Sequence, residues 1–283
     1  MFPTHSRVHA ALPRVGRCFR TALDGRIALT RDWRHLLRTL AHVGPCALQT
    51  RHHGARLVTR LDPATCGPGI ANGLLANATG AVHGRLPQWS HAWGFLRTCD
   101  CCASPGRIEV HNAAGGDFLQ FCAPPHGDGH AWSDALAALV GDDLVPAAAP
   151  PVGCPFALLR LGRAHVRLPF DLTGLATLLR AFGDESLPVR CTLRTADVCH
   201  RRDLVPRRVD VDASLLTLGS PGASAQVALL FVRALALTSD AAGAALHLVD
   251  ADDDILLTFS AAIDPFAASA WHGALRLAFP GLR

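Results

Sequence analysis

The sequence lacks lysine and tyrosine and has a single methionine among its 283 residues. All 27 of its basic residues are therefore arginine. The missing residues have AT-rich codons, whereas Ala, Gly, Pro, Arg and Leu are abundant, so the bias indicates a GC-rich, bacterial genome. It also means that every cationic contact must come from a guanidinium, whose planar fork suits carboxylates and phosphates.

Long apolar runs are also missing, since no stretch reaches the roughly 18 apolar residues of a spanning helix. The best candidate, residues 223–237, is too short and contains Arg233. Hydrophobic residues make up 49% and charged residues 18%, which excludes a disordered chain. The net charge of +4 is mild and favours an acidic small ligand over nucleic acid. We expect no nucleic-acid partner and no membrane-spanning segment.

A secretory signal is absent from the first residues, because 1–20 carry four arginines and no apolar stretch. We therefore expect the ten cysteines to be mostly reduced thiols in a cytoplasmic protein. The motifs G-x-S-x-G, P-loop, H-E-x-x-H and G-x-G-x-x-G are missing as well. No catalytic residue is predicted, and a binding protein is favoured over an enzyme.

An internal repeat organises what is present. Residues 107–121 and 245–259 each read as an apolar-alternating run, a polar turn and a second run ending in Phe, at an offset of 138 residues. This pattern is typical of a β-hairpin. A helix opening on Ala-Trp follows each hairpin, at Trp132 and Trp271. A helical stripe and a strand-like run also precede both, so a unit of four elements occurs twice in the same order.

The boundary between the units is a Pro/Ala-rich stretch, 145–152. We predict a first repeat over 21–143, a linker over 144–156 and a second repeat over 157–283. Strands flanked by helices without strict β-α-β alternation indicate an α+β fold of two similar repeats. Each repeat is expected to form an antiparallel β-sheet with flanking helices.

This order resembles the bacterial haemin-utilisation family of the HemS/ChuX type, whose members carry two such repeats. The segments that carry the resemblance lie mainly in the first repeat: the helix 33–44, Thr50-Arg51, the strand 86–95, the hairpin 108–121 and the Ala131-Trp132 helix. The likeness covers residues 27–141 closely and 170–279 loosely. It implies a cytoplasmic haem-binding protein that serves haem uptake, trafficking or use as an iron source, with possible assistance to haem degradation.

Family members bind haem through a His, with Arg side chains near the propionates. The resemblance places the family's linker His at His165, with Arg163 and Arg167 beside it. We predict His165 as the iron ligand and the two arginines as propionate contacts, since charge-assisted hydrogen bonds are the strong ones. His52, His53 and His83 form the fallback set. A solvated basic linker remains the alternative reading of this segment.

Two family positions differ in this chain. The position of the first-repeat His is Leu57, and an Arg of the family falls near His83. These differences keep open a second hypothesis, a degenerate structural or regulatory partner that binds no haem. Under the first hypothesis the partners are haem and either an inner-membrane haem importer or a haem oxygenase.

Three further clusters have ordinary explanations. Cys99, Cys101 and Cys102 lack the paired spacing of a zinc site and are expected to be loop thiols. The segment 126–130 reads first as a turn and helix cap. The acids of 250–254 are expected in the turn of the second hairpin rather than in a calcium loop.

Overall fold

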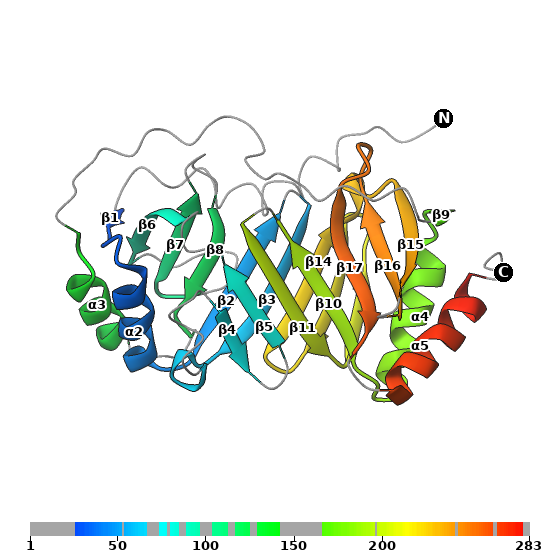
Figure 1. The fold of residues 1–283 in the computed structure, drawn as a ribbon, viewed down its shortest axis with the longest axis horizontal. Coiled ribbons are helices and arrows are strands. Elements are labelled where there is room, and N and C mark those ends of the chain that lie inside the picture. The colour runs from blue at the N-terminus through cyan, green and yellow to red at the C-terminus, as the bar shows by residue number, and fades with distance from the viewer. Residues whose placement is uncertain are drawn as a thin grey trace. The chain divides into compact units, whose positions relative to one another are not determined.

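In the computed structural model the described residues are 26–52, 54–66, 74–77, 80–84, 89–96, 104–112, 117–124, 129–141, 166–195, 197–240, 243–262 and 265–279. Within them the chain forms two antiparallel sheets and four α-helices. The predicted α+β class is confirmed, and the ribbon is drawn in Figure 1.

The elements of the first half follow the predicted order of helix, strands, hairpin and Trp helix. They are β1 (Ile27–Ala28), α2 (Trp33–Val43), β2 (Cys46–His52), β3 (Ala55–Leu61), the 3-10 turn η3 (Pro63–Thr65), β4 (Leu74–Asn77), β5 (Gly80–Gly84), β6 (Trp89–Phe95), β7 (Arg107–Asn112), β8 (Asp117–Cys122) and α3 (Gly129–Ala138).

The second half runs through the same order with more strands. Its elements are β9 (Val166–Pro169), α4 (Leu172–Asp184), β10 (Val189–Arg194), β11 (Val198–Leu204), β12 (Arg208–Val211), β13 (Leu215–Ser220), β14 (Ala223–Ala228), the 3-10 turn η6 (Leu229–Phe231), β15 (Ala234–Asp240), β16 (Gly243–Val249), β17 (Ile255–Ala261) and α5 (Pro265–Ala278).

The strand orders of the two sheets correspond. The nine-stranded sheet has the order β1-β6-β7-β8-β2-β3-β14-β13-β12. The eight-stranded sheet, read from its β9 edge, has the order β9-β15-β16-β17-β10-β11-β5-β4. The remaining strands are exchanged, since β4 and β5 extend the sheet of the second half and β12–β14 extend that of the first. We expected each sheet to come from one repeat. Periodicity marks a strand but does not identify a partner that is distant in sequence.

The described residues fall into two compact units. The first holds 26–49, 60–66, 74–75 and 89–141, and the second holds 50–59, 76–84 and 166–279. The linker predicted over 144–156 lies outside the described residues, and the repeat boundaries stay predictions.

Helices of the first unit pack through the apolar stripes that the sequence predicts. In α2, Leu36, Leu37 and Leu40 are buried. Asp32 caps this helix by accepting hydrogen bonds from the amides of Arg34 and His35, both at 3.0 Å. The helices α2 and α3 lie side by side (Figure 1). The helix α3 packs on the strands, because its Trp132 ring contacts Gly106 at the start of β7. Val140 follows the end of α3 at Ala138 and is exposed.

In the second unit, α4 and α5 lie together beside the eight-stranded sheet (Figure 1). Asp171 caps α4, with its carboxylate 2.9 Å from the amide of Gly174. The Trp271 ring of α5 donates its Nε1–H to the Ala244 carbonyl of β16 at 2.9 Å. Gly183 lies within α4 near its end. A side chain there would overlap the Pro206 carbonyl oxygen, so the glycine allows a close approach rather than a helix stop.

The segment 223–237, the most apolar run of the sequence, folds as β14, η6 and the start of β15. None of the helices in the described part of the chain is both long and apolar enough to cross a bilayer.

Candidate ligand-binding face

The eight-stranded sheet of the second unit has one face in the core and one facing outward. His200, Leu193 and Val82 are at most 3% exposed and lie on the core face of β11, β10 and β5. Successive side chains of a strand point to opposite faces. The outward face therefore carries the residues next to them: Cys199, Arg201, Arg194, Thr192 and His83.

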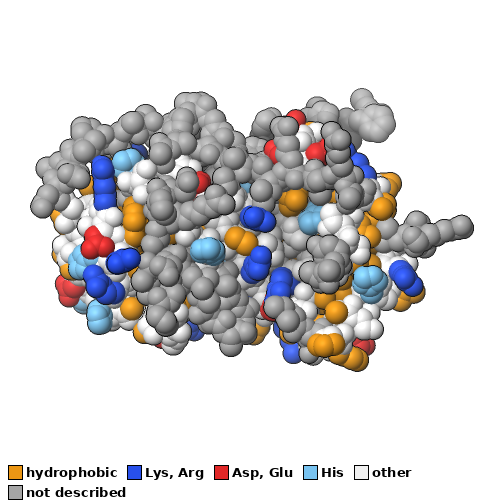
Figure 2. Space-filling model, viewed as in Figure 1, with side chains coloured by type: hydrophobic (Ala, Val, Ile, Leu, Met, Phe, Trp, Pro, Cys, Tyr) orange, Lys and Arg blue, Asp and Glu red, His pale blue; other side chains and the backbone are white. Residues whose placement is uncertain are grey.

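Strand register brings these outward side chains into one cluster. Cys199 of β11 lies directly opposite His83 of β5 on one side and Arg194 of β10 on the other. Arg201 lies two residues along β11, opposite Thr192. The side chains of His83, Arg194 and Arg201 are exposed, and Cys199 is half-buried. We call these four residues the Cys199 cluster. Figure 2 shows basic side chains gathered over β10 and β11, with an imidazole beside them.

An acid on the same strand, Asp203, is already paired. Asp203 lies on the same face of β11 as Arg201 and receives two hydrogen bonds of 2.7 Å from the Arg190 guanidinium. No ion pair to Arg194 or Arg201 is found among the described residues. The cluster therefore offers two guanidiniums, an imidazole and a thiol to a ligand, a set that suits an anion.

The other end of the same face carries the predicted Arg167. This residue lies on the edge strand β9, and its guanidinium is 2.7 Å from the Asp253 carboxylate in the β16–β17 turn. Both side chains are nearly half exposed, at 47% and 45%. Asp250 closes the turn by accepting from the amides of Asp252 and Asp254, so the predicted turn is confirmed.

Between these ends, His247 of β16 ties three strands together. Its Nε2 is 2.8 Å from the Thr238 hydroxyl of β15, and its Nδ1 is 2.9 Å from the Thr258 hydroxyl of β17. Both ring nitrogens are thus engaged along the sheet. One of these contacts to a threonine hydroxyl would have to break before a ring nitrogen could bind a ligand on this face.

A second threonine-bound histidine lies on the core face. The His200 ring is fully buried, with Nδ1 3.0 Å from the Thr50 hydroxyl and Nε2 2.9 Å from the Thr59 hydroxyl. Burial, followed by the nearby Arg202 charge, lowers the pKa of His200 to about 3. This imidazole is therefore neutral at physiological pH and inaccessible to a ligand.

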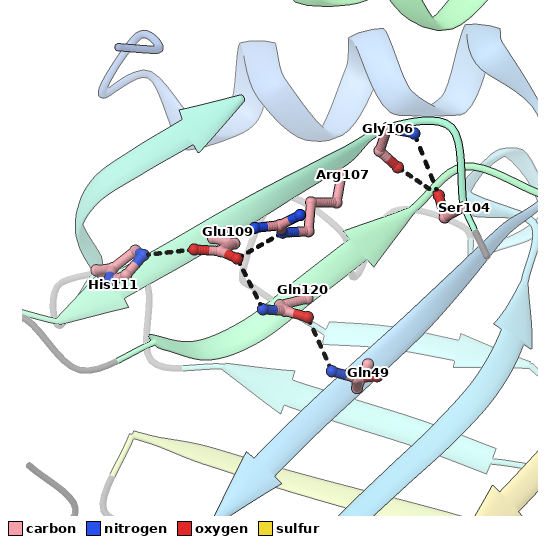
Figure 3. A network of polar contacts seen from close by, with 7 residues as sticks. All are labelled: Gln49, Ser104, Gly106, Arg107, Glu109, His111 and Gln120. Carbon is pink, nitrogen blue, oxygen red and sulfur yellow. Dashed lines mark hydrogen bonds and ion pairs between the residues drawn. The ribbon is translucent and has the colours of Figure 1, made fainter. Parts of the chain in front are cut away.

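The first unit has a buried polar network at the matching hairpin (Figure 3). Glu109 accepts hydrogen bonds from the Arg107 Nε at 2.6 Å and from the Gln120 amide at 3.0 Å. The His111 ring lies 3.4 Å from its other oxygen. Gln120 in turn accepts from the Gln49 amide at 2.8 Å. The five side chains come from β7, β8 and β2 and form one continuous chain of contacts.

The partners of Glu109 stabilise its ionised form. Burial alone would raise its pKa, but the hydrogen bond from His111 and the charge and hydrogen bond of Arg107 outweigh it, so the pKa lies below the ordinary value. The Arg107 guanidinium also stacks on the Phe95 ring, 4.2 Å from its centroid. The network is internally satisfied around its carboxylate, which favours a structural role.

The predicted site residues are only partly brought together. His165, Arg163 and His53 lie outside the described residues. His52 ends β2 with its side chain 4% exposed. His83 and Arg167 share the outward face but are six strands apart, about 29 Å at ~4.8 Å per strand. Leu57, at the position of the family's first-repeat His, is fully buried in the core of the second unit.

Sequence reasoning missed the Cys199 cluster. His83 and Cys199 are distant in sequence and become neighbours through the pairing of β5 with β11. Alternation around the buried residues of β11 could have shown which side chains point outward. No sequence signal identifies β5 as the partner strand.

The sequence predicts mostly reduced thiols and no zinc site at the Cys99–Cys102 segment. Among the described residues, five cysteines form no disulfide: Cys46, Cys66, Cys122, Cys191 and Cys199. Burial raises the pKa of Cys46 to about 12, so that thiol is unreactive. Cys99, Cys101 and Cys102 lie outside the described residues. In the described ranges no three His, Cys, Asp or Glu side chains are grouped to hold a metal ion.

Comparison with known proteins finds the same fold in haem proteins. No protein-family model and no curated sequence matches the chain. Holo-PhuS, a heme-binding protein from Pseudomonas aeruginosa, matches with a TM-score of 0.70 and 16% identity, over 90% of this chain and 86% of that one. ChuS, an E. coli heme oxygenase, matches with 0.74 and 14% identity, over 96% and 92%.

A further structure of ChuS, the heme degrading enzyme of Escherichia coli O157:H7, matches with a TM-score of 0.73 and 15% identity, over 97% of this chain and 94% of that one. The resemblance to the HemS/ChuX type is thereby confirmed at the level of the fold. At this identity the likeness extends to the fold alone.

Proposed function

We propose that the chain is a divergent haem-binding protein of the HemS/ChuX type. The observation that carries the proposal is the near full-length likeness to PhuS and ChuS, at TM-scores of 0.70–0.74. The corresponding strand orders of the two sheets support a duplicated unit, each half with its hairpin and Trp helix. A similar fold does not determine function, so the rest of the argument for haem binding must come from the side chains of the site.

The Cys199 cluster, on the outward face of the eight-stranded sheet, offers cationic side chains to the carboxylates of a cargo such as haem. Haem has an iron that needs only one or two protein ligands, because the porphyrin supplies four, and it has two propionates. Arg194 and Arg201 would supply guanidiniums for carboxylates as an alternative to Arg167, which lies four to five strands away in the same sheet. His165 and Arg163 remain the predicted ligand and propionate contact, and Arg167 would have to share its guanidinium with Asp253.

The cellular role follows from the same reading. The protein would accept haem in the cytoplasm after import, in exchange with an inner-membrane importer or a haem oxygenase, and so serve iron acquisition. Haem itself supplies the reactivity for any degradation. Degradation by this chain is a separate question, tested by bleaching of the bound haem under a reductant and oxygen.

The first experiment is a haemin titration followed at the Soret band. A saturable shift at one haem per chain is the expected result, and no shift up to high micromolar haemin would refute the proposal. His165→Ala is expected to weaken binding at least tenfold and change the spectrum, whereas Arg167→Ala should weaken binding and leave the spectrum unchanged. His52→Ala, at a buried position, tests the fallback set.

One observation favours the alternative, a partner protein that binds no haem. Leu57 stands where the family has a histidine, and it is a core residue with no exposure. A protein that had lost its haem site would show this replacement. The same titration separates the two functions.

A further inference from the structure

The last helix of the second unit carries an apolar stripe on its exposed side. The helix α5 buries one side in the core, whereas Phe266 is 71% exposed and Leu277 is 86% exposed. These are the two most exposed large hydrophobic residues in the described part of the chain. Ala270 and Gly273 lie between them, at steps of four, three and four residues, so all four share one face of the helix. We call these four residues the α5 stripe.

The matching helix of the first unit lacks this stripe. When α3 is aligned with α5 on their tryptophans, Asp134 stands at the position of Gly273. Ala138 stands at the position of Leu277. Both residues of α3 are exposed, as expected for a helix that faces water. A Trp helix therefore packs on its sheet without a large apolar residue at the end of this face, and the fold does not explain the α5 stripe.

Packing within the chain does not explain the glycine of the stripe either. A side chain at Gly273 would extend into open space, with no atom within 4 Å of its Cβ. Glycine inside a helix costs about 1 kcal/mol relative to alanine. Together with Ala270, its neighbour on the stripe, Gly273 provides a flat surface that the backbone of another helix can approach closely. The exposed side of α5 is therefore suited to a second helix.

The α5 stripe has the same pattern in both chain directions, which is large, small, small, large. In an antiparallel pair of α5 helices, Phe266 would pack against the partner's Leu277, and Ala270 would lie against the partner's Gly273. A two-fold axis between the helices repeats the same contacts on both copies, as the interface of a symmetric dimer requires. Steps of four and three residues are typical of helices that pack along a shared seam. The stripe is thus complementary to itself.

The charges around the stripe agree with an antiparallel pair. Gly174 in the first turn of α4 lies beside the Ala278 carbonyl at the end of α5, and a Phe–Trp ring contact joins the last turn of α4 to the middle of α5. The two helices are therefore antiparallel, and the exposed Asp184 and Glu185 at the end of α4 lie near the start of α5. Arg276 lies at the other end of α5, which contains no acidic residue. Antiparallel docking brings the basic end of each copy to the acidic end of its partner, whereas parallel docking would pair like charges.

We propose that the α5 stripe is the contact surface of a homodimer, in which α5 of one copy packs antiparallel on α5 of the other. Burial of Phe266 and Leu277 on both copies supplies the driving force, because removing apolar surface from water gains about 25 cal/mol per Å². At ~1.5 Å per residue the helix is about 21 Å long, so the contact is at the small end of protein interfaces. The dimer is therefore reversible, with dissociation in the micromolar range. It forms without haem and is independent of the proposed function.

The test is sedimentation velocity of the full-length, haem-free protein from low to high micromolar concentration. We expect the apparent mass to rise from 30.0 kDa towards twice that value as the concentration increases. Leu277→Asp should leave the protein monomeric. Gly273→Asp, which introduces the acid of α3, should do the same because it separates the helices. Val140→Asp is the matched control, since Val140 is a 55% exposed apolar residue outside the stripe, and this variant should dimerise as the wild type does.

An exchange of charges tests the antiparallel orientation. Arg276→Glu should weaken dimerisation roughly tenfold, because it places an acid near the partner's Asp184 and the partner's Glu185. The triple variant Arg276→Glu/Asp184→Arg/Glu185→Arg should restore the wild-type association. A triple variant that dimerises as weakly as Arg276→Glu overturns the antiparallel pair.

Two further outcomes would overturn the proposal. One is a wild-type protein that remains monomeric at high micromolar concentration. The other is a dimer that Leu277→Asp and Gly273→Asp leave intact, since another surface would then hold the copies together. Because Leu277 and Gly273 are exposed, far-ultraviolet circular dichroism of both variants is expected to match the wild type, and Leu277→Ser provides a second replacement if it does not.

Discussion

The matching hairpins of the two units place different chemistry at the same position. Glu109 lies opposite Gln120 in β7–β8, and His247 lies opposite Thr258 in β16–β17. The second pair lies 138 residues after the first in sequence, which is the offset of the repeat. The first pair belongs to a charged network with Arg107, whereas the second belongs to a set of contacts between one imidazole and two threonine hydroxyls.

The other faces of these hairpins are much more alike. Ile108, Val110 and Phe121 are fully buried in the first unit, as are Leu246, Leu248 and Phe259 in the second. The apolar face sets the strand register, because a slip of one residue would expose it. The polar face is then free to change its chemistry while the backbone stays the same. This explains how a chain at 14–16% identity keeps the fold of PhuS and ChuS.

The largest expected effect comes from the charged hairpin. Glu109→Ala leaves the Arg107 guanidinium, only 7% exposed, without its carboxylate. Breaking a buried pair in this way costs about 3–5 kcal/mol. His247→Ala removes the contacts to the Thr238 and Thr258 hydroxyls and should cost about 1–2 kcal/mol. Urea unfolding at pH 7 measures both, and equal costs would mean that the charge in the first network contributes nothing.

The exposed Arg167–Asp253 pair is a matched control for charge without burial. Asp253→Asn should change the free energy of unfolding by no more than about 1 kcal/mol, because solvent screens exposed pairs. Asparagine also tolerates the left-handed backbone of this residue, whose φ is 63°.

The next effect concerns the buried, threonine-bound His200 and the dependence of stability on pH. The folded pKa of His200 is about 3, below the ordinary 6.5, so the folded state stays neutral where the unfolded chain takes up a proton. Its contribution is complete above pH ~6.5 and is lost as the pH falls towards ~3, by at most ~1.4 kcal/mol per pH unit.

His200→Gln should flatten this slope between pH 6.5 and pH 4, relative to the wild type, in urea unfolding curves taken at each pH. His272→Gln, at an exposed position on α5, is the control and should leave the slope unchanged. A wild-type slope that survives His200→Gln would assign the acid sensitivity to another group.

These expectations use both what the sequence predicts and what it misses. The helices and the two hairpins follow from local periodicity, since residues three, four or two apart report on their own element. The exchange of β4–β5 and β12–β14 between sheets is not local. It is the pairing of β5 with β11 that makes His83 a neighbour of Cys199, so the cluster required the structure. The family resemblance predicted the fold, but it could not predict side chains that differ from the family.

A smaller effect distinguishes the two Trp helices. The Trp271 Nε1–H bonds the Ala244 carbonyl, whereas the buried Trp132 Nε1–H has no hydrogen-bond partner within the described residues. Both Trp→Phe replacements shorten a buried ring, so their difference isolates the indole N–H. Trp271→Phe should cost about 1–2 kcal/mol more than Trp132→Phe. A larger loss from Trp132→Phe would place a donor–acceptor contact at Trp132 and contradict the comparison.

The smallest effects concern the caps of the equivalent helices α2 and α4. Asp32 accepts from two amides and Asp171 from one. Replacing an aspartate cap by alanine costs about 1 kcal/mol, so Asp32→Ala should cost a few tenths of a kcal/mol more than Asp171→Ala.

Asp184→Ala removes a negative charge from the last turn of α4, where the helix dipole disfavours it. It should therefore be neutral or slightly stabilising. Thermal unfolding followed by circular dichroism measures all three. If Asp184→Ala is as costly as the cap variants, these losses reflect a general effect of removing acids from a protein with net charge +4, and capping is not their cause.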